Sequence, residues 1–208
     1  MTSRWERIAR AQAGADYATT YADRFARLAA AGQDVHGEAA LVTRLLAPPA
    51  RVLDAGCGTG RIAVRLDELG YDVVGVDVDA TMLDVARRDA PHLSWVETDL
   101  ATFDLGATFD LVLLAGNILP LLEPGTLDAV AARLAAHAAP GGRVVCGFGL
   151  DAAHLPGDCP VTPLADVDAA MAAAGLVARE PLATWDGDPY DGGGYVVTVH
   201  ERCERIGS

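Results

Sequence analysis

The sequence has little basic charge, and this shortage excludes one class of partner. Its 208 residues carry 16 Lys and Arg against 29 Asp and Glu, a net charge of −13. A nucleic-acid backbone is repelled by such a field unless a local basic strip offsets it. The doublet Arg87-Arg88 makes no such strip, because it lies between Asp84 and Asp89. We therefore expect no nucleic-acid partner.

Paired cysteines and long apolar runs are also lacking. The four cysteines are spread over positions 57, 146, 159 and 203, without the spacing of a zinc or redox site, so we expect reduced thiols and no metal. The first ten residues alternate charges where a signal peptide needs an apolar run. The longest apolar stretch, 111–122, is shorter than the about 20 residues that cross a bilayer. These absences predict a cytoplasmic chain without a membrane partner.

Hydrophobic residues make up 51% of the chain, enough for a packed core. Residues 1–47 are helical in pattern and end at Pro48-Pro49, which indicates an N-terminal helical cap or lid of the same domain. From 48 to 208, short apolar runs alternate with amphipathic segments, as in βα units. The expected strands are 51–55, 72–77, 93–97, 109–115, 143–148, 176–184 and 195–201. The predicted fold is α/β, with a Rossmann-like, doubly wound, mostly parallel sheet of seven strands and one antiparallel edge strand.

A glycine-rich turn, D-A-G-C-G-T-G at 54–60, follows the first expected strand and precedes a helix. Such a turn points backbone N–H groups and the positive end of a helix at a ligand. Two ligand classes fit. Residues 58–63 formally match the dinucleotide pattern, which favours an NAD(P)-dependent oxidoreductase. Asp54, at the strand end, opposes a pyrophosphate and favours a cationic ligand such as an amino group or a sulfonium.

Five segments in order resemble class I S-adenosylmethionine-dependent methyltransferases of the small single-domain type. They are the D-x-G-x-G-x-G motif at 54–60, the second-strand segment 74–83, the third-strand motif 95–100, the fourth strand 109–112 and the turn 139–143. The resemblance covers about residues 51–149. It implies S-adenosylmethionine as the cofactor and methyl transfer by in-line displacement.

The resemblance also implies roles for individual residues. The glycine turn would line the methionine portion of the cofactor, with Asp54 near its amino group. Asp77 would accept hydrogen bonds from the ribose hydroxyls, and Asp99 would accept one from the adenine amino group. The candidate cofactor-binding residues are Tyr21, Asp54, Gly56, Cys57, Gly58, Gly60, Asp77, Val78, Met82, Asp99, Leu100, Ala115 and Asn117. Three alternatives stay open: a helix cap for Asp79, a turn role for Asp99 and core packing for Met82.

The end of the fourth strand, Ala115-Gly116-Asn117, is expected to face the sulfonium. Asn117 offers both a donor and an acceptor, although a turn asparagine is the alternative interpretation. Family members that methylate adenine N6 carry Asn/Asp-Pro-Pro-aromatic here. The sequence at 117–120, N-I-L-P, departs from that motif and argues against methylation of nucleic-acid bases.

Several side chains outside these motifs have two interpretations. Tyr17, Tyr21 and His36 lie on a segment that folds over the cofactor in relatives with a helical N-terminus. A Glu38–Arg61 pair would hold this lid in place. The alternative is that these are ordinary residues of amphipathic helices. Trp185 and Tyr190 would line an acceptor pocket or pack at the sheet edge. His36, His154 and Tyr190 are the candidate bases, and none is assigned as catalytic.

The sequence therefore predicts a methyltransferase that acts on an oxygen or nitrogen nucleophile of a small molecule. The oxidoreductase stays open as an alternative. A protein that binds S-adenosylmethionine or S-adenosylhomocysteine without catalysis is the third interpretation.

Overall fold

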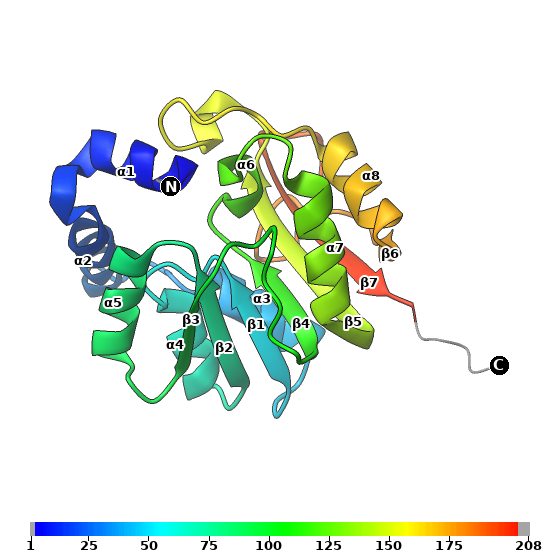
Figure 1. The fold of residues 1–208 in the computed structure, drawn as a ribbon, viewed down its shortest axis with the longest axis horizontal. Coiled ribbons are helices and arrows are strands. Elements are labelled where there is room, and N and C mark those ends of the chain that lie inside the picture. Colours follow the sequence, from blue (N-terminus) through cyan, green and yellow to red (C-terminus); the bar gives the residue numbers. More distant parts are fainter. Residues whose placement is uncertain (1–2, 204–208) are drawn as a thin grey trace.

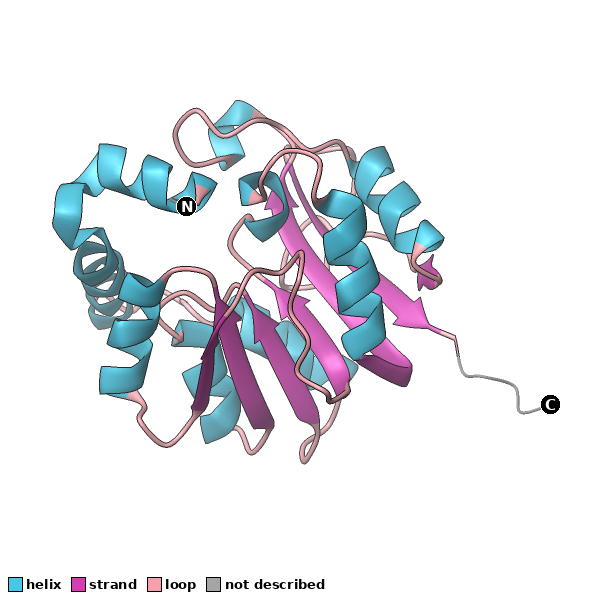
Figure 2. Cartoon of the chain, viewed as in Figure 1, coloured by secondary structure: helices cyan, strands magenta, loops and turns pink. Residues whose placement is uncertain are grey.

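The computed structural model describes residues 3–203. The strands are β1 (Arg51–Ala55), β2 (Asp72–Asp77), β3 (Ser94–Glu97), β4 (Phe109–Leu114), β5 (Ala138–Gly149), β6 (Leu176–Ala178) and β7 (Tyr195–Arg202). They form one sheet in the order β3-β2-β1-β4-β5-β7-β6; its strands are magenta in Figure 2. The predicted seven-stranded, mostly parallel sheet is confirmed.

Helices cover both faces of the sheet (Figure 1). They are α1 (Arg4–Ala13), α2 (Tyr17–Ala30), α3 (Gly37–Leu45), α4 (Arg61–Glu68), α5 (Ala80–Asp89), α6 (Ile118–Leu121), α7 (Leu127–His137) and α8 (Leu164–Ala173), with 3₁₀ turns η1 (Gly14–Asp16) and η2 (Ala152–His154). Within residues 3–203, no helix combines the length and hydropathy needed to cross a bilayer.

The antiparallel strand is β7, which lies between β5 and β6 and pairs antiparallel with both. The edge strand itself is therefore β6, and it is shorter than the expected strand 176–184. Pro181 has no N–H to donate to a ladder, and pairing with β7 resumes only at Leu182, which exchanges two backbone hydrogen bonds with Val197.

Alternate residues of the central strands enter two cores, as expected for strands buried on both faces. Val52 and Leu111 pack with α3 and α4, whereas Leu53 and Val112 pack with α7 and α8. Strand β1 is central and pairs with β2 and β4, so the strand order reverses beside it. In doubly wound sheets the ligand crevice lies at the carboxyl ends of the strands at this point.

Within the expected cap 1–47, only α1, η1 and α2 do not pack on a face of the sheet. These three elements are called the cap from here on. Figure 1 shows α1 running across the upper end of the sheet toward α6. Helix α3 packs on the sheet instead, because Leu41 and Val42 are buried among the β1 and α4 side chains.

Candidate functional site

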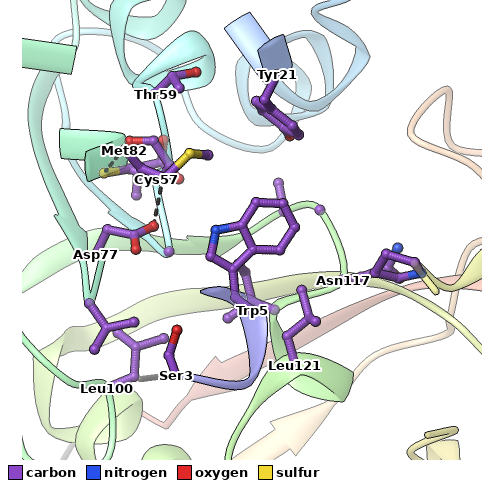
Figure 3. Close-up of a pocket in the computed structure, with 18 of the residues that line it drawn as sticks. Ser3, Trp5, Tyr21, Cys57, Thr59, Asp77, Met82, Leu100, Asn117 and Leu121 are labelled. Atoms are coloured by element: carbon purple, nitrogen blue, oxygen red, sulfur yellow. Dashed lines mark hydrogen bonds between the residues drawn. The ribbon is translucent and has the colours of Figure 1, made fainter. Parts of the chain in front are cut away.

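A cavity of about 310 Å³ lies between the cap and the carboxyl ends of β1, β2 and β4. Its sheet side carries the glycine loop and three carboxylates, and its cap side carries aromatic rings. Figure 3 shows Trp5 near its centre, with Asp77, Tyr21 and Leu121 around it. The lining residues are Ser3, Trp5, Tyr21, Arg24, Phe25, Asp54, Gly56, Cys57, Gly58, Thr59, Arg61, Ile62, Asp77, Val78, Met82, Asp99, Leu100, Ala115, Gly116, Asn117, Ile118, Leu121, Leu122, Glu123, Thr126 and Pro156.

The glycine loop crosses the end of β2 and is fixed there by backbone hydrogen bonds. The N–H groups of Gly56 and Cys57 both donate to Val76 O, at 2.8 and 3.0 Å. Gly56 and Gly58 have positive φ angles of 84° and 54°, which L side chains rarely adopt. A Cβ at Gly56 would lie 2.5 Å from Ile118 Cδ1. The loop therefore stays close-packed while its backbone faces the cavity.

Asp77 ends β2 and joins the loop to the next helix. Its Oδ2 accepts from the Gly58 N–H at 2.8 Å, and its Oδ1 accepts from the Asp79 N–H at 2.9 Å. Burial raises the pKa of Asp77 to about 6. Each carboxylate oxygen can accept two hydrogen bonds, so the side chain keeps capacity for hydroxyl donors in the cavity.

Asp54 is the buried carboxylate whose charge is least compensated. Among the described residues, nothing hydrogen-bonds to its Oδ2, although only 2% of the residue is exposed. Burial raises the pKa of Asp54 to about 7, against the lowering effect of the Arg61 charge. A buried acceptor without a partner is costly unless a ligand supplies the donor. An ammonium group is the donor that also restores charge balance.

The far end of the cavity is apolar, with one exposed carboxylate. Met82 and Leu100 are buried, while Val78 is 44% exposed. Asp99 Oδ1 accepts from the Ala101 N–H at 2.8 Å, so the turn role considered for this residue is present alongside its place in the cavity lining. These side chains offer apolar cover to a flat ring, and the Asp99 carboxylate lines the same cavity.

Gly60 is the one candidate cofactor-binding residue outside the lining. It precedes α4 with a φ of 81°, and a Cβ there would lie 2.5 Å from Cη2 of Trp95. The close neighbour is thus a ring packed behind the loop. The role of Gly60 toward the methionine portion of the cofactor stays a prediction.

Asn117 follows β4 and has both polar atoms of its side chain engaged. Its Nδ2 donates to His154 O at 3.0 Å, and its Oδ1 accepts from the Gly149 N–H at 2.6 Å. Its φ of 67° is left-handed, a conformation that asparagine tolerates. The turn interpretation therefore describes its amide, while Ala115 and Asn117 both remain in the cavity lining.

The cap contributes a wall of aromatic rings. Trp5 meets Tyr21 edge to face with ring centres 5.9 Å apart, and Tyr21 meets Phe25 at 5.0 Å. Tyr21 was expected in the site, whereas Trp5 and Phe25 were missed. The available signal was an aromatic residue on each of two amphipathic helices, which sequence alone does not separate from ordinary packing.

Contacts of Arg61 and Tyr17 connect α3 and the cap to the rest of the site. Arg61 forms a bidentate ion pair with Glu38 at 2.7 and 3.1 Å, as predicted, and its guanidinium lies 4.3 Å from the Phe25 ring centre. Tyr17 donates to Asp79 Oδ2 at 2.5 Å. Asp79 also accepts from the first N–H groups of α5 and so caps that helix, as expected.

Other candidates lie outside the lining. Trp185 packs over Gly147, donates to the Tyr195 hydroxyl at 3.1 Å and shields the sheet. Tyr190 packs against the core and donates to Gly193 O. The sheet-packing interpretation is therefore correct for both. His36 and His154 are likewise absent from the lining, so none of the three candidate bases reaches the cavity.

These features match the parts of S-adenosylmethionine. Asp54 offers an unpaired carboxylate to an amino group, Asp77 offers acceptors to ribose hydroxyls, and Val78 with Met82 offers apolar cover to a purine. A dinucleotide fits less well because its pyrophosphate would face Asp54.

Comparison with known proteins agrees with this match. Residues 52–142 match the family model described as "Methyltransferase domain". The chain is 33% identical to a TehB-like SAM-dependent methyltransferase from Corynebacterium glutamicum. That comparison covers 89% of this chain and 98% of the other, with a TM-score of 0.80.

Two curated relatives match about half of the chain. One is the dTDP-3-amino-3,6-dideoxy-alpha-D-glucopyranose N,N-dimethyltransferase of Streptomyces fradiae, 38% identical over 55% of this chain and 47% of its own length. The other is the ribosomal protein L11 methyltransferase of Symbiobacterium thermophilum, 39% identical over 54% of this chain and 38% of its own length. The chain thus spans half or less of the length of these curated relatives.

Proposed function

The chain belongs to the class I S-adenosylmethionine-dependent methyltransferases, and we propose that it transfers a methyl group to an amine nitrogen of a small molecule. The cofactor of the family is S-adenosylmethionine. The observation that carries the acceptor class is the roof of the cavity, where Trp5 of α1 packs with Leu121 of α6.

A small acceptor suits this roof better than a protein does. Arg4 donates to Pro120 O at 2.9 Å, and Arg7 pairs with Glu123 at 3.2 Å, so α1 is tied to the α6 side. A protein segment would have to displace both contacts to reach the reacting centre. The Streptomyces fradiae relative, whose name specifies an amino sugar, also supports a small acceptor.

The choice of nitrogen rests on the ionisable groups of the cavity. No histidine is among the described lining residues, and Lys is absent from the sequence. Burial raises the pKa of Tyr21 above its ordinary value, so its hydroxyl is protonated at neutral pH. The carboxylates of the lining are already engaged in this proposal, Asp54, Asp77 and Asp99 by the cofactor and Glu123 by Arg7. A hydroxyl acceptor needs a base, whereas a neutral amine reacts through its lone pair and needs none in that step.

In this proposal the chain contributes position rather than acid–base chemistry. The bound cofactor supplies an activated methyl group on a sulfonium. Asp54 holds the amino group, Asp77 holds the ribose hydroxyls, and Asp99 with Leu100 meets the adenine. Trp5 and Tyr21 exclude water from the opposite wall. Holding both reactants in line can contribute about 7–11 kcal/mol to lowering the barrier.

The proposal also assigns a role to each part of the chain. Residues 48–208 form the S-adenosylmethionine-binding methyltransferase domain, and 1–47 form an N-terminal helical segment of that domain, of which the cap lies over the cavity. The candidate cofactor residues are those predicted from the sequence, with Gly60 acting through packing behind the loop.

A labelled-methyl transfer assay tests the proposal. The chain is incubated with S-adenosylmethionine carrying a labelled methyl group and pairs of small acceptors that differ only in an amine or a hydroxyl, amino sugars and their nucleotide-linked forms included. We expect label on the amines and none on the hydroxyl counterparts. Transfer to hydroxyls alone, or to ribosomal protein alone, would contradict the proposed acceptor; no transfer to any acceptor would favour binding without catalysis.

A further inference from the structure

Arg24 of α2 differs from the other cation that lines the cavity. Arg61 is neutralised by its bidentate pair with Glu38. Arg24 has no acidic partner among the described residues, and its guanidinium carbon lies 6.0 Å from the centre of the Phe25 ring. An uncompensated guanidinium at the rim of a cavity is available for a ligand anion.

The segment that carries Arg24 has more basic than acidic residues, in contrast to the chain as a whole. Residues 3–30 contain five arginines and three acidic residues, whereas the whole chain has a net charge of −13. Two of these arginines, Arg4 and Arg7, reach across to Pro120 and Glu123 on the opposite rim. An anionic small molecule is therefore repelled less by this segment than by the acidic remainder of the chain.

The acidic side chains of the cavity come from other elements than Arg24. Asp54, Asp77 and Asp99 lie on the sheet side, where they match the cofactor, and Glu123 is already paired with Arg7. Arg24 lies on the cap side, beside the aromatic wall formed by Trp5, Tyr21 and Phe25. Flat rings next to a planar guanidinium suit a ring-bearing molecule with a charged substituent.

We propose that Arg24 recognises an anionic group of the methyl acceptor, a phosphate or a carboxylate, and so determines acceptor specificity. The inference rests on the proposed function. The acceptor then presents its amine toward the cofactor and its negative group toward the cap. The binding contribution of Arg24 is electrostatic, so it weakens as salt is raised.

Calorimetry with protein saturated with S-adenosylhomocysteine tests this. The probes are thymidine diphosphate and inorganic pyrophosphate for phosphate, and glucuronate for carboxylate. Thymidine and glucose are the uncharged counterparts. The variant is Arg24→Gln, which keeps helix propensity. The matched control is Arg27→Gln, one turn along the same helix, exposed and outside the cavity lining.

We expect one anionic class to bind the wild type at least tenfold better than its uncharged counterpart. We also expect its Kd to rise at least fivefold in Arg24→Gln and by less than twofold in Arg27→Gln. Equal binding by Arg24→Gln and wild type, or no preference for anions, would overturn the inference. So would a fivefold loss of S-adenosylhomocysteine affinity in Arg24→Gln with anion binding intact, which would assign Arg24 to the cofactor. A wild type that fails to bind S-adenosylhomocysteine would instead contradict the proposed function.

Discussion

Replacing Asp54 with asparagine is expected to stabilise the ligand-free protein while it weakens cofactor binding. The side chain is 2% exposed, and its Oδ2 has no partner among the described residues. Asparagine keeps the shape and removes the charge. Because an unpaired buried charge opposes folding and favours a cationic ligand, one substitution changes the two free energies in opposite directions.

The stability change follows from the raised pKa. Burial moves the pKa of Asp54 from 3.8 in the unfolded chain to about 7 in the folded one. Between about pH 4 and pH 7 the folded state therefore keeps a proton on Asp54 that the unfolded chain has lost. The free energy of unfolding of the wild type falls as the pH rises through this range. At 1.36 kcal/mol per unit, the full cost above pH 7 is at most about 4 kcal/mol. The gain of Asp54→Asn is expected to be about 3 kcal/mol larger at pH 8 than at pH 5.

The affinity change has its own pH dependence. An ammonium pairs with the ionised carboxylate, so below pH 7 binding must first release a proton from Asp54. The wild-type Kd for S-adenosylhomocysteine is expected to rise about tenfold from pH 8 to pH 6. In Asp54→Asn the Kd at pH 8 is expected to be on the order of 10²-fold weaker, and this pH dependence disappears.

Urea unfolding at pH 5 and 8 measures the first effect, and calorimetry at pH 6 and 8 measures the second. Asp77 also titrates in this range, but it does so in the wild type and in Asp54→Asn, so its effect on stability largely cancels in the difference between them. The reasoning is refuted if Asp54→Asn binds S-adenosylhomocysteine within threefold of the wild type at pH 8. A stability gain that is equal at the two pH values would also refute it.

Two further substitutions test the loop and the ion pair beside it by urea unfolding. Glu38→Gln leaves Arg61 without its carboxylate partner at a site about 15% exposed, so we expect the free energy of unfolding to fall by about 2 kcal/mol. The exposed control Glu68→Gln is expected to lower it by less than about 0.5 kcal/mol. Equal losses would show that burial does not strengthen the pair. Gly60→Ala and Gly116→Ala share a φ of 81°, but only the first Cβ meets an indole, at 2.5 Å, whereas the second has no atom within 4 Å. We expect the first to cost about 1–3 kcal/mol more than the second, and similar costs would contradict the packing role.

Local pattern was enough to predict most of the fold. The glycine turn, the buried strands and the Asp77 position all follow from residues close together in sequence, where periodicity and turn chemistry act directly. The strand at the edge of the sheet was harder to predict. Pro181 interrupts the expected strand 176–184, and the resumption of pairing at Leu182 depends on a partner strand distant in sequence.

The cap side of the site could be predicted only in part. Tyr21 was expected from the resemblance, yet Trp5 and Arg24 reach the cavity because α1 and α2 fold back over the sheet. That placement depends on long-range contacts such as Tyr17 with Asp79, which leave no spacing signal. The same reason explains Asn117, whose amide is taken by Gly149 and His154 through loop packing.

The central claim is that the buried carboxylates at the ends of β1 and β2 select a nucleoside that carries an ammonium group over one that carries a pyrophosphate. A crystal structure of the chain soaked with equal concentrations of S-adenosylhomocysteine and NAD tests it most directly. We expect S-adenosylhomocysteine alone, with its ammonium within about 3 Å of Asp54 Oδ2 and its ribose hydroxyls donating to Asp77. Density for the dinucleotide, with its pyrophosphate over the glycine loop, would contradict the claim.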